Sequence, residues 1–320
     1  MLNGEFKTVN GFQPMSRIIM GSFPFGSSIS EEESFRLLDR YWEAGGRTLD
    51  TARSYNGEWH NGDSKSERTI GRWIRKNGVR SEVTLVTKGA YPELRDMHRS
   101  RLSPDCIRYD INTSLAVLGV DKVDLFLLHR DDESIPVGEI VDAADEVVAD
   151  GLADAVGVSN WKTERIAAAN EYAVKNGKVP FTVSQILWNM AKITEGMLSD
   201  DTLVYMTPEE GQWYRENHFP VMAFTPQAAG FFSKYPNIDS LSSRSRIYAT
   251  PVNLKRAERV QKICSEIGCS PAALGIAYIS CGKIDGYAVI GASNVWQLED
   301  TLTASDLVIG QDIIDEIEND

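Results

Sequence analysis

The sequence predicts an α/β fold, a (β/α)8 TIM barrel that forms a single domain over residues 1–320. Eight short runs rich in β-forming residues alternate with helical segments, a pattern typical of βα units around a parallel sheet. No linker rich in proline, glycine or serine divides the chain, and its 320 residues suit one barrel with insertions. The expected strands are residues 17–21, 47–50, 83–88, 123–129, 154–159, 183–188, 221–224 and 288–290.

Cap signals mark the starts of several helices between these strands. Ser30 precedes Glu33 by the spacing of a capping box. Ser103 and Ser270 each precede a proline, which places an N-cap residue before a proline at the first helical position. We therefore expect helices to begin directly after these three serines.

The segments outside the regular βα pattern also favour a barrel. Residues 5–15 predict a hairpin that closes the barrel floor. The glycine fingerprint of a doubly wound dinucleotide fold is missing, because residues 21–26 lead into no immediate helix. Two connections, 191–207 and 225–252, are longer than usual, and we expect them to build or cover the site.

Composition excludes several functional classes. The formal net charge of −13 leaves no basic face for nucleic acid. No apolar run approaches the ~20 residues needed to cross a bilayer, and residues 1–11 lack the layout of a signal peptide. Four cysteines without ligand spacing indicate reduced thiols and no metal site. We expect a cytoplasmic protein with a small-molecule partner, neither nucleic acid nor membrane; its oligomeric state stays open.

Four polar residues lie where successive predicted strands end. Asp50 closes the second strand, Tyr55 follows in its loop, Lys88 closes the third, and His129 closes the fourth. Singly, each has a structural explanation, such as a turn-forming aspartate, a solvated lysine or a surface tyrosine. The active sites of TIM barrels lie at the carboxyl ends of the strands, so their joint position favours catalysis.

Those four residue types suit proton transfer to a carbonyl oxygen. A free tyrosine has a pKa of about 10, and a neighbouring ammonium is expected to lower it. Asp50 would hold Lys88 charged, and Tyr55 would act as general acid. His129 would hydrogen-bond the carbonyl oxygen and stabilise the oxyanion that forms there.

The segments around these residues resemble those of aldo-keto reductases. The similar blocks are residues 49–55 (LDTARSY), 66–71 (SERTIG), 87–88 (TK), 123–129 (VDLFLLH) and 157–160 (GVSN). The resemblance runs from about Gly21 to Thr301. It implies a (β/α)8 barrel and reversible hydride transfer between a nicotinamide and an aldehyde or ketone, with Asp50, Tyr55, Lys88 and His129 as catalytic residues.

The resemblance also implies a cofactor site. Ser159, Asn160 and Gln185 would hold the carboxamide, and Phe224 would stack on the nicotinamide. Residues 225–230 resemble the pyrophosphate loop, and the start of the last predicted helix resembles the adenosine site. The other residues assigned to the cofactor are Gly21, Ser22, Thr225, Pro226, Gln227, Ala228, Gly230, Lys234, Gly291, Ser293, Gln297 and Asp300.

Cofactor choice depends on how a 2′-phosphate would be held. Many family members carry a cation near position 293, and this chain has Ser293 there. The same Gly-Ala-Ser-Asn form occurs in the potassium-channel β-subunit branch, which binds the phosphorylated cofactor. Ser293 and Gln297, with a cation from residues 244–246, favour NADP(H); NAD(H) is possible.

Three aromatic residues flank the site positions. Phe23, Trp59 and Trp161 could form an aromatic wall for the substrate, or any of them could be ordinary packing. Two other functions stay open at this point. One is a cofactor-binding barrel that acts as a redox sensor or protein partner, and the other is a metal-dependent hydrolase built on Asp50 and His129.

Overall fold

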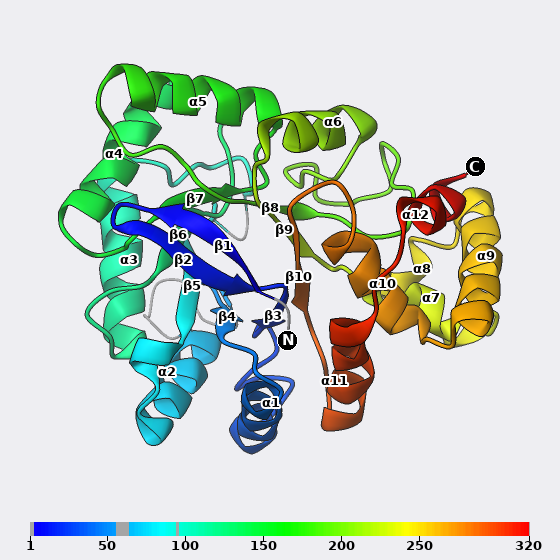
Figure 1. Ribbon diagram of the computed structural model, residues 1–320. Coiled ribbons are helices and arrows are strands. Elements are labelled where there is room, and N and C mark those ends of the chain that lie inside the picture. Colours follow the sequence, from blue (N-terminus) through cyan, green and yellow to red (C-terminus); the bar gives the residue numbers. More distant parts are fainter. Residues whose placement is uncertain (1–2, 56–63, 94–95, 320) are drawn as a thin grey trace.

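A closed barrel of eight parallel strands forms the centre of the computed structural model, which describes residues 3–55, 64–93 and 96–319 (Figure 1). Strand β10 pairs with β3 and so closes the ring. Each of the eight predicted runs overlaps one barrel strand, so the predicted fold is confirmed. The strands are β3 (Ile18–Gly21), β4 (Thr48–Asp50), β5 (Thr84–Gly89), β6 (Leu125–Leu128), β7 (Val156–Ser159), β8 (Ser184–Leu187), β9 (Val221–Phe224) and β10 (Gly286–Ile290).

Helices surround the barrel (Figure 1). The three predicted starts are confirmed, because the hydroxyls of Ser30, Ser103 and Ser270 each accept a hydrogen bond from the backbone three residues on. The longer helices are α1 (Glu31–Glu43), α2 (Lys65–Asn77), α3 (Pro104–Leu118), α4 (Val137–Ala149), α5 (Thr163–Lys175), α6 (Pro208–Asn217), α9 (Pro251–Ile267), α10 (Pro271–Ser280), α11 (Val295–Leu302) and α12 (Gln311–Glu318).

The predicted hairpin crosses the floor of the barrel, at the amino ends of its strands (Figure 1). It consists of β1 (Asn3–Thr8) and β2 (Gly11–Ser16), paired antiparallel. Phe6 and Met15 are buried and pack against barrel-lining residues such as Val86 and Leu125. Backbone and side-chain hydrogen bonds, including one from Thr84 to the carbonyl of Pro14, fasten the hairpin to the strand starts. The expectation of a closed floor is therefore confirmed.

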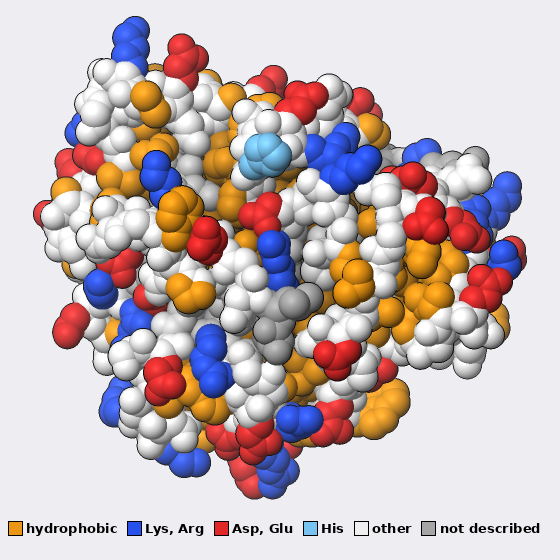
Figure 2. All heavy atoms as spheres, in the orientation of Figure 1, with side chains coloured by type: hydrophobic (Ala, Val, Ile, Leu, Met, Phe, Trp, Pro, Cys, Tyr) orange, Lys and Arg blue, Asp and Glu red, His pale blue; other side chains and the backbone are white. Residues whose placement is uncertain are grey.

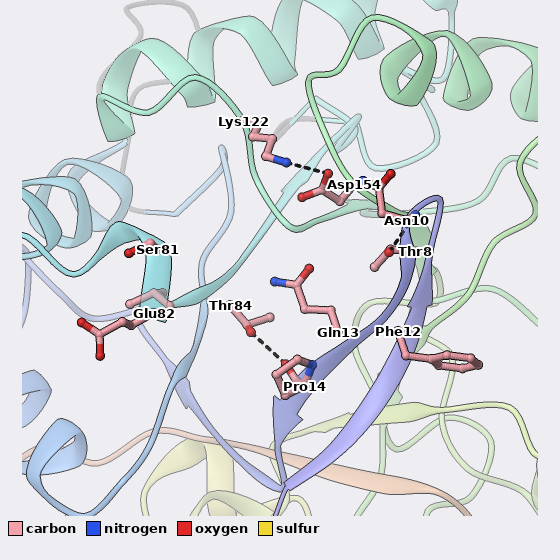
Figure 3. A pocket seen from close by; sticks show the side chains of 11 residues that line it. Thr8, Asn10, Phe12, Gln13, Pro14, Ser81, Glu82, Thr84, Lys122 and Asp154 are labelled. Carbon is pink, nitrogen blue, oxygen red and sulfur yellow. Dashed lines mark hydrogen bonds and ion pairs between the residues drawn. The ribbon is translucent and has the colours of Figure 1, made fainter.

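A hollow of ≈ 340 Å³ lies between this hairpin and the neighbouring loops (Figure 3). Gln13 and Lys122 are among its lining residues, together with Ser81 of the short helix η1 (Arg80–Glu82). Because it is at the floor, it lies at the opposite end of the barrel from Asp50 and Lys88. Its volume therefore says nothing about the predicted catalytic site.

Strand alternation determines which side chains reach the mouth, at the carboxyl ends of the strands. An apolar layer that includes Ile19, Val86, Leu127, Val183 and Met222 fills the barrel interior. Side chains two residues further along a strand point to the same side. The residues two positions after these five apolar residues are Gly21, Lys88, His129, Gln185 and Phe224. The sequence thus places the predicted site directly above the apolar layer.

The two long connections lie after β8 and β9. The first runs over residues 188–207, and the second, over 225–250, contains the short helices η2 (Ala228–Gly230), α7 (Phe231–Lys234), η3 (Ile238–Ser240) and α8 (Ser243–Arg246). Both begin at the mouth, which agrees with the expectation that they build the site. A further short helix, η4 (Thr303–Asp306), follows α11.

The distribution of surface charge concerns binding to nucleic acid, and the length and hydropathy of the helices concern insertion into a membrane. On the face in Figure 2, acidic and basic side chains are interspersed rather than gathered by sign. Within the described ranges, no individual helix combines the length and apolar character of a membrane span. The pair α9 and α10, bent by 94°, meets those two criteria only when taken together.

Candidate active site

The Lys88 ammonium is the centre of the predicted catalytic set. It is fully buried and donates to Asp50 Oδ2 (2.8 Å), to the carbonyl of Thr51 (2.8 Å) and to the phenol oxygen of Tyr55 (3.2 Å). These three bonds use all three donors of an ammonium group. The structure therefore brings Asp50, Tyr55 and Lys88 together and fixes the direction of each contact.

The loop after β4 positions Tyr55 because it continues to pair with β5. The amide of Thr51 donates to the carbonyl of Val86, and the amide of Arg53 donates to the carbonyl of Lys88. The hydroxyl of Ser64, the N-cap residue of α2, donates to the carbonyl of Tyr55 at 3.3 Å. Tyr55 is therefore held to β5 on one side and to α2 on the other.

Ser66, in the segment SERTIG (residues 66–71), contacts the residues that directly follow β3 and β4. Ser66 Oγ lies 2.8 Å from the hydroxyl of Thr51 and 2.7 Å from that of Ser22. Ser22 is fully buried and donates to the carbonyl of Asp50. Its hydroxyl is thus bound to the end of β4, and the cofactor contact expected of Ser22 stays a prediction.

Burial decides the direction of the Tyr55 pKa. The expectation that Lys88 lowers this pKa below its ordinary value is wrong in its net direction. Burial of the phenol raises the pKa, and the opposing effect of Lys88 is smaller, while Asp50 adds to the rise. The reason is that desolvation penalises the phenolate more than one nearby cation stabilises it. Tyr55 therefore keeps its proton at neutral pH.

The ionisation states of Lys88 and His129 follow from the same environment. Burial alone would lower the pKa of Lys88, but Asp50 and Tyr55 together raise it above its ordinary value. Burial lowers the pKa of His129 well below 6.5, and the cations Arg130 and Lys88 lower it further. The site thus combines a charged ammonium with a neutral imidazole, and a neutral imidazole keeps one N–H donor.

His129 lies beside Tyr55 at the mouth. Their ring centroids are 6.0 Å apart and the rings meet edge to face. On its other side the His129 ring contacts Tyr91, with a centroid separation of 4.7 Å. Ser54 Oγ lies 3.4 Å from His129 Nδ1. The fourth predicted catalytic residue therefore joins the other three.

Three amide and hydroxyl side chains line the next part of the mouth. Gln185 Nε2 donates to Asp50 Oδ1 (2.9 Å), and Ser159 Oγ donates to the carbonyl of Gln185. Asn160 has a left-handed backbone (φ 58°), and its Nδ2 donates to Ser159 Oγ and to the carbonyl of His129. Both amide hydrogens of Asn160 are therefore committed, which leaves this group rich in acceptors.

The loop after β9 has an unusual backbone. Thr225, Ala228 and Ala229 have positive φ angles of 49–54°, and Gly230 follows at 81°. Residues other than glycine rarely adopt this region, and such runs occur where function requires them. Gln227 Nε2 donates to Thr301 Oγ1 (2.9 Å), which fastens the loop to α11. Gln227 is therefore an anchor of this loop.

Residues at the start of α11 hold one another. The amide of Ser293 donates to Gln297 Oε1 (2.9 Å), and the amide of Gln297 donates to Asn294 Oδ1. Gly291 and Ser293 are exposed. Asp300 lies one turn further along α11, half-buried, and Lys234 is exposed at the end of α7. The Gln227–Thr301 bond brings the C-terminal turn of α11, where Asp300 lies, next to the anchored loop.

The aromatic residues predicted to form a substrate wall, where the structure describes them, differ in burial and in position. Phe23 is 46% exposed, and its ring meets that of Tyr55 edge-on at 5.1 Å. Trp161 is fully buried and packs against Phe181, so the structure places it in the core and corrects its assignment to the wall. Trp59 lies outside the described residues. Phe23 alone of the described candidates lies at the mouth.

Comparison with known proteins decides the family. The model of the Aldo/keto reductase family matches residues 17–319. The chain belongs to the aldo/keto reductase family. A norsolorinic acid reductase of Emericella nidulans is 27% identical over 321 residues, which cover 95% of this chain and 78% of the relative.

Two further relatives of this aldo/keto reductase carry names of the aryl-alcohol dehydrogenase type. One, from Saccharomyces cerevisiae, is 26% identical over 315 residues, covering 92% of this chain and 78% of the relative. The other, the aryl-alcohol dehydrogenase [NADP(+)] of Phanerodontia chrysosporium, is 29% identical over 177 residues, covering 52% of this chain and 44% of the relative. The family and these names assign the protein to the oxidoreductases.

Sequence reasoning missed two residues of this aldo/keto reductase that touch the catalytic set. Tyr91 lies three residues after Lys88, and Arg130 directly follows His129. Both follow strand ends, which was the signal available for them. In the part of the chain that the structure describes, no cluster of three or more His, Cys, Asp or Glu side chains has the arrangement of a metal site.

Proposed function

We propose that this aldo/keto reductase reduces an aldehyde or ketone to an alcohol with NADP(H), with Tyr55 as the general acid. One observation carries the proposal. The Tyr55 phenol lies 3.2 Å from an ammonium that is itself paired with a buried carboxylate. A neutral acid beside a fixed cation suits proton donation to an oxygen that gains negative charge.

Each catalytic residue has a separate task in this reaction. Neutral His129 donates its N–H to the carbonyl oxygen and orients the substrate. As negative charge grows on that oxygen, the proton moves to it from the phenol of Tyr55. Lys88 stabilises the resulting phenolate, and Asp50 keeps Lys88 charged and aimed at Tyr55.

The donor and acceptor set at the mouth fits a nicotinamide. When bound, the cofactor supplies the hydride. Asn160 Oδ1 and Gln185 Oε1 are acceptors, which suits the NH2 group of a carboxamide, and Phe224 offers a flat apolar face. The loop over residues 225–230 keeps the positive φ angles of residues 228–230 by its own hydrogen bonds, because the amides of Ala228 and Gly230 donate to the carbonyls of Thr225 and Gln227. The ammonium of Lys234, exposed at the end of α7 directly after this loop, would hold the pyrophosphate.

NADP(H) rather than NAD(H) is proposed because a cation lies near the same mouth. The guanidinium of Arg244 lies 5.6 Å from the ring of Phe23, so the short helix α8 reaches back over the site. With Ser293 and Gln297 it would hold a 2′-phosphate. Fluorescence titration with NADPH and NADH tests this choice. Arg244→Met should weaken NADPH binding alone, and equal loss for both cofactors would refute the assignment.

An aromatic carbonyl is the proposed substrate class. Phe23 and Tyr91 present rings on the two sides of the Tyr55 and His129 pair. Aryl groups pack well against such edges. Two relatives are named aryl-alcohol dehydrogenases, which agrees with this class.

The decisive experiment compares the purified protein with its Tyr55→Phe variant, using NADPH and a nitrobenzaldehyde. The variant should bind NADPH as the parent does and lose at least about a hundredfold in kcat, the usual effect of losing a general acid. Normal turnover in Tyr55→Phe would refute the role of this residue. Tight cofactor binding without turnover across an aldehyde panel would instead favour the sensor function.

We also propose the cytoplasm as the compartment. The four cysteines are free thiols, which suits a reducing environment. Subcellular fractionation tests this assignment, and recovery of the protein with secreted material would contradict it.

A further inference from the structure

Arg130 is a nearly buried arginine that joins two segments of the mouth. It directly follows His129 and is 5% exposed. Its Nη1 donates to the carbonyl of His129 (2.9 Å). Its other two contacts are with the long connection after β8, where Nε donates to Thr202 Oγ1 (2.9 Å) and Nη2 to Asp200 Oδ2 (3.2 Å). One side chain thus ties the end of β6 to the 200–202 turn.

The turn that receives Arg130 is itself ordered by hydrogen bonds. Asp200 Oδ1 accepts from both the hydroxyl and the amide of Thr202 (2.5 and 3.0 Å). Asp200 therefore uses one oxygen to form the turn and the other to bind Arg130. The planar guanidinium fixes both partners in direction, which an ammonium cannot do.

A second link runs in parallel with the first. Asn160 Nδ2 donates to the same carbonyl of His129 (3.3 Å), and Asn160 Oδ1 accepts from the amide of Val204 (3.3 Å). The guanidinium of Arg130 also lies 5.0 Å from the ring of Tyr91, which contacts His129. The backbone of His129 is thus held by two donors, each bound to the connection over residues 188–207.

We propose that Arg130 is a positioning residue: it fixes the strand end that carries His129 to the 200–202 turn, and so sets the geometry of the substrate side of the mouth. This rests on the proposed role of His129 as the donor to the carbonyl oxygen. A small displacement of such a donor is enough to slow the reaction strongly, even though Arg130 touches no reacting atom.

Arg165 offers a matched control. It is also largely buried, binds the Asp131 carboxylate through two nitrogens (2.9 and 3.0 Å), and lies on the neighbouring helix α5. None of its hydrogen bonds within the described ranges reaches His129 or the 200–202 turn. Arg165→Met therefore removes a comparable ion pair without breaking the proposed link.

The test compares Arg130→Met with Arg165→Met in the full-length protein. Arg130→Met should lower kcat for a nitrobenzaldehyde about ten- to a hundredfold while the Kd of NADPH changes little. Hydrogen exchange followed by mass spectrometry should show faster exchange over residues 200–205 in this variant alone. Added guanidinium ion should restore part of the lost kcat in Arg130→Met and none in Arg165→Met.

The outcomes separate this proposal from the proposed function. If both variants lose kcat equally, and exchange over residues 200–205 stays as in the parent, Arg130 is an ordinary stabilising arginine and the proposal fails. If the parent shows no turnover, the proposed function fails while the exchange experiment still tests the link. Should Arg130→Met not fold, Arg130→Lys and Asp200→Asn are expected to show the same local rise in exchange, and parent-like exchange in both would overturn the proposal.

Discussion

The Nζ atom of Lys88 lies 3.2 Å from the phenol oxygen of Tyr55, yet burial still raises the pKa of that phenol. The lysine therefore does not ionise the tyrosine in the resting protein. In the proposed reaction Lys88 would act when the phenol gives up its proton, because the ammonium already lies beside the oxygen that becomes charged. This order of events agrees with a site arranged for carbonyl reduction.

Replacing Lys88 separates its catalytic effect from its effect on stability. Lys88→Met should reduce kcat by at least about a hundredfold. It should also lower the free energy of unfolding by about 3–5 kcal/mol, because Asp50 becomes a buried unpaired charge. The double variant Lys88→Met with Asp50→Asn should recover stability in urea denaturation and stay inactive. An active double variant would contradict the role of Lys88.

The pH dependence of reduction follows from the directions of two pKa values. Tyr55 must be protonated, and burial raises its pKa, so activity should fall only well above its ordinary value of about 10. His129 must be neutral, and its pKa lies well below 6.5. We expect kcat/KM for reduction to be flat between about pH 6 and about pH 9. An acid limb near pH 6.5 would show that His129 titrates there.

The hairpin at the floor should affect stability without affecting chemistry. Phe6 is 1% exposed against the inner layer, whereas Phe12 on the same hairpin is 67% exposed. Phe6→Ala should lower the free energy of unfolding by about 3–5 kcal/mol and leave kcat unchanged. Phe12→Ala is the control and should stay within about 0.5 kcal/mol. Equal losses in urea denaturation would mean that the hairpin does not plug the barrel.

Trp161 should behave as a core residue. Its ring is fully buried, and its Nε1 has no hydrogen-bond partner in the described structure. Trp161→Phe should change the free energy of unfolding by about 1–3 kcal/mol and leave the KM for aldehydes unchanged. A selective change in KM across a series of aldehydes of increasing size would return Trp161 to the substrate wall.

The strands and the positions of the four candidate catalytic residues could be predicted because both follow from the alternation of side chains along a strand. Apolar runs fixed the strand positions, and a polar residue at the end of a run, such as Lys88 or His129, had to lie at the mouth. The cap residues Ser30, Ser103 and Ser270 set the helix starts by local hydrogen bonds, which depend on few residues and are therefore readable in a sequence.

What could not be predicted depended on contacts between distant segments. The position of Trp161 directly after Asn160 predicts a side chain at the mouth, but Asn160 has a positive φ and the Trp161 ring is buried in the core. The sequence predicts the effect of Lys88 on the pKa of Tyr55, but not the larger effect of burial, which depends on the folded surroundings of the phenol. The ion pair between Arg130 and Asp200 joins residues that are seventy positions apart in the chain, so no local pattern in the sequence indicates it.

Among the described residues, hydrocarbon side chains such as Val86 and Leu127 fill the barrel between Lys88 and the hairpin, and such side chains carry no group that could relay a proton. In the proposed reaction, a proton given up by Tyr55 would therefore be replaced from bulk water through the mouth of the barrel. The alcohol product would leave through the same mouth, so slow release of the alcohol would also delay reprotonation of Tyr55.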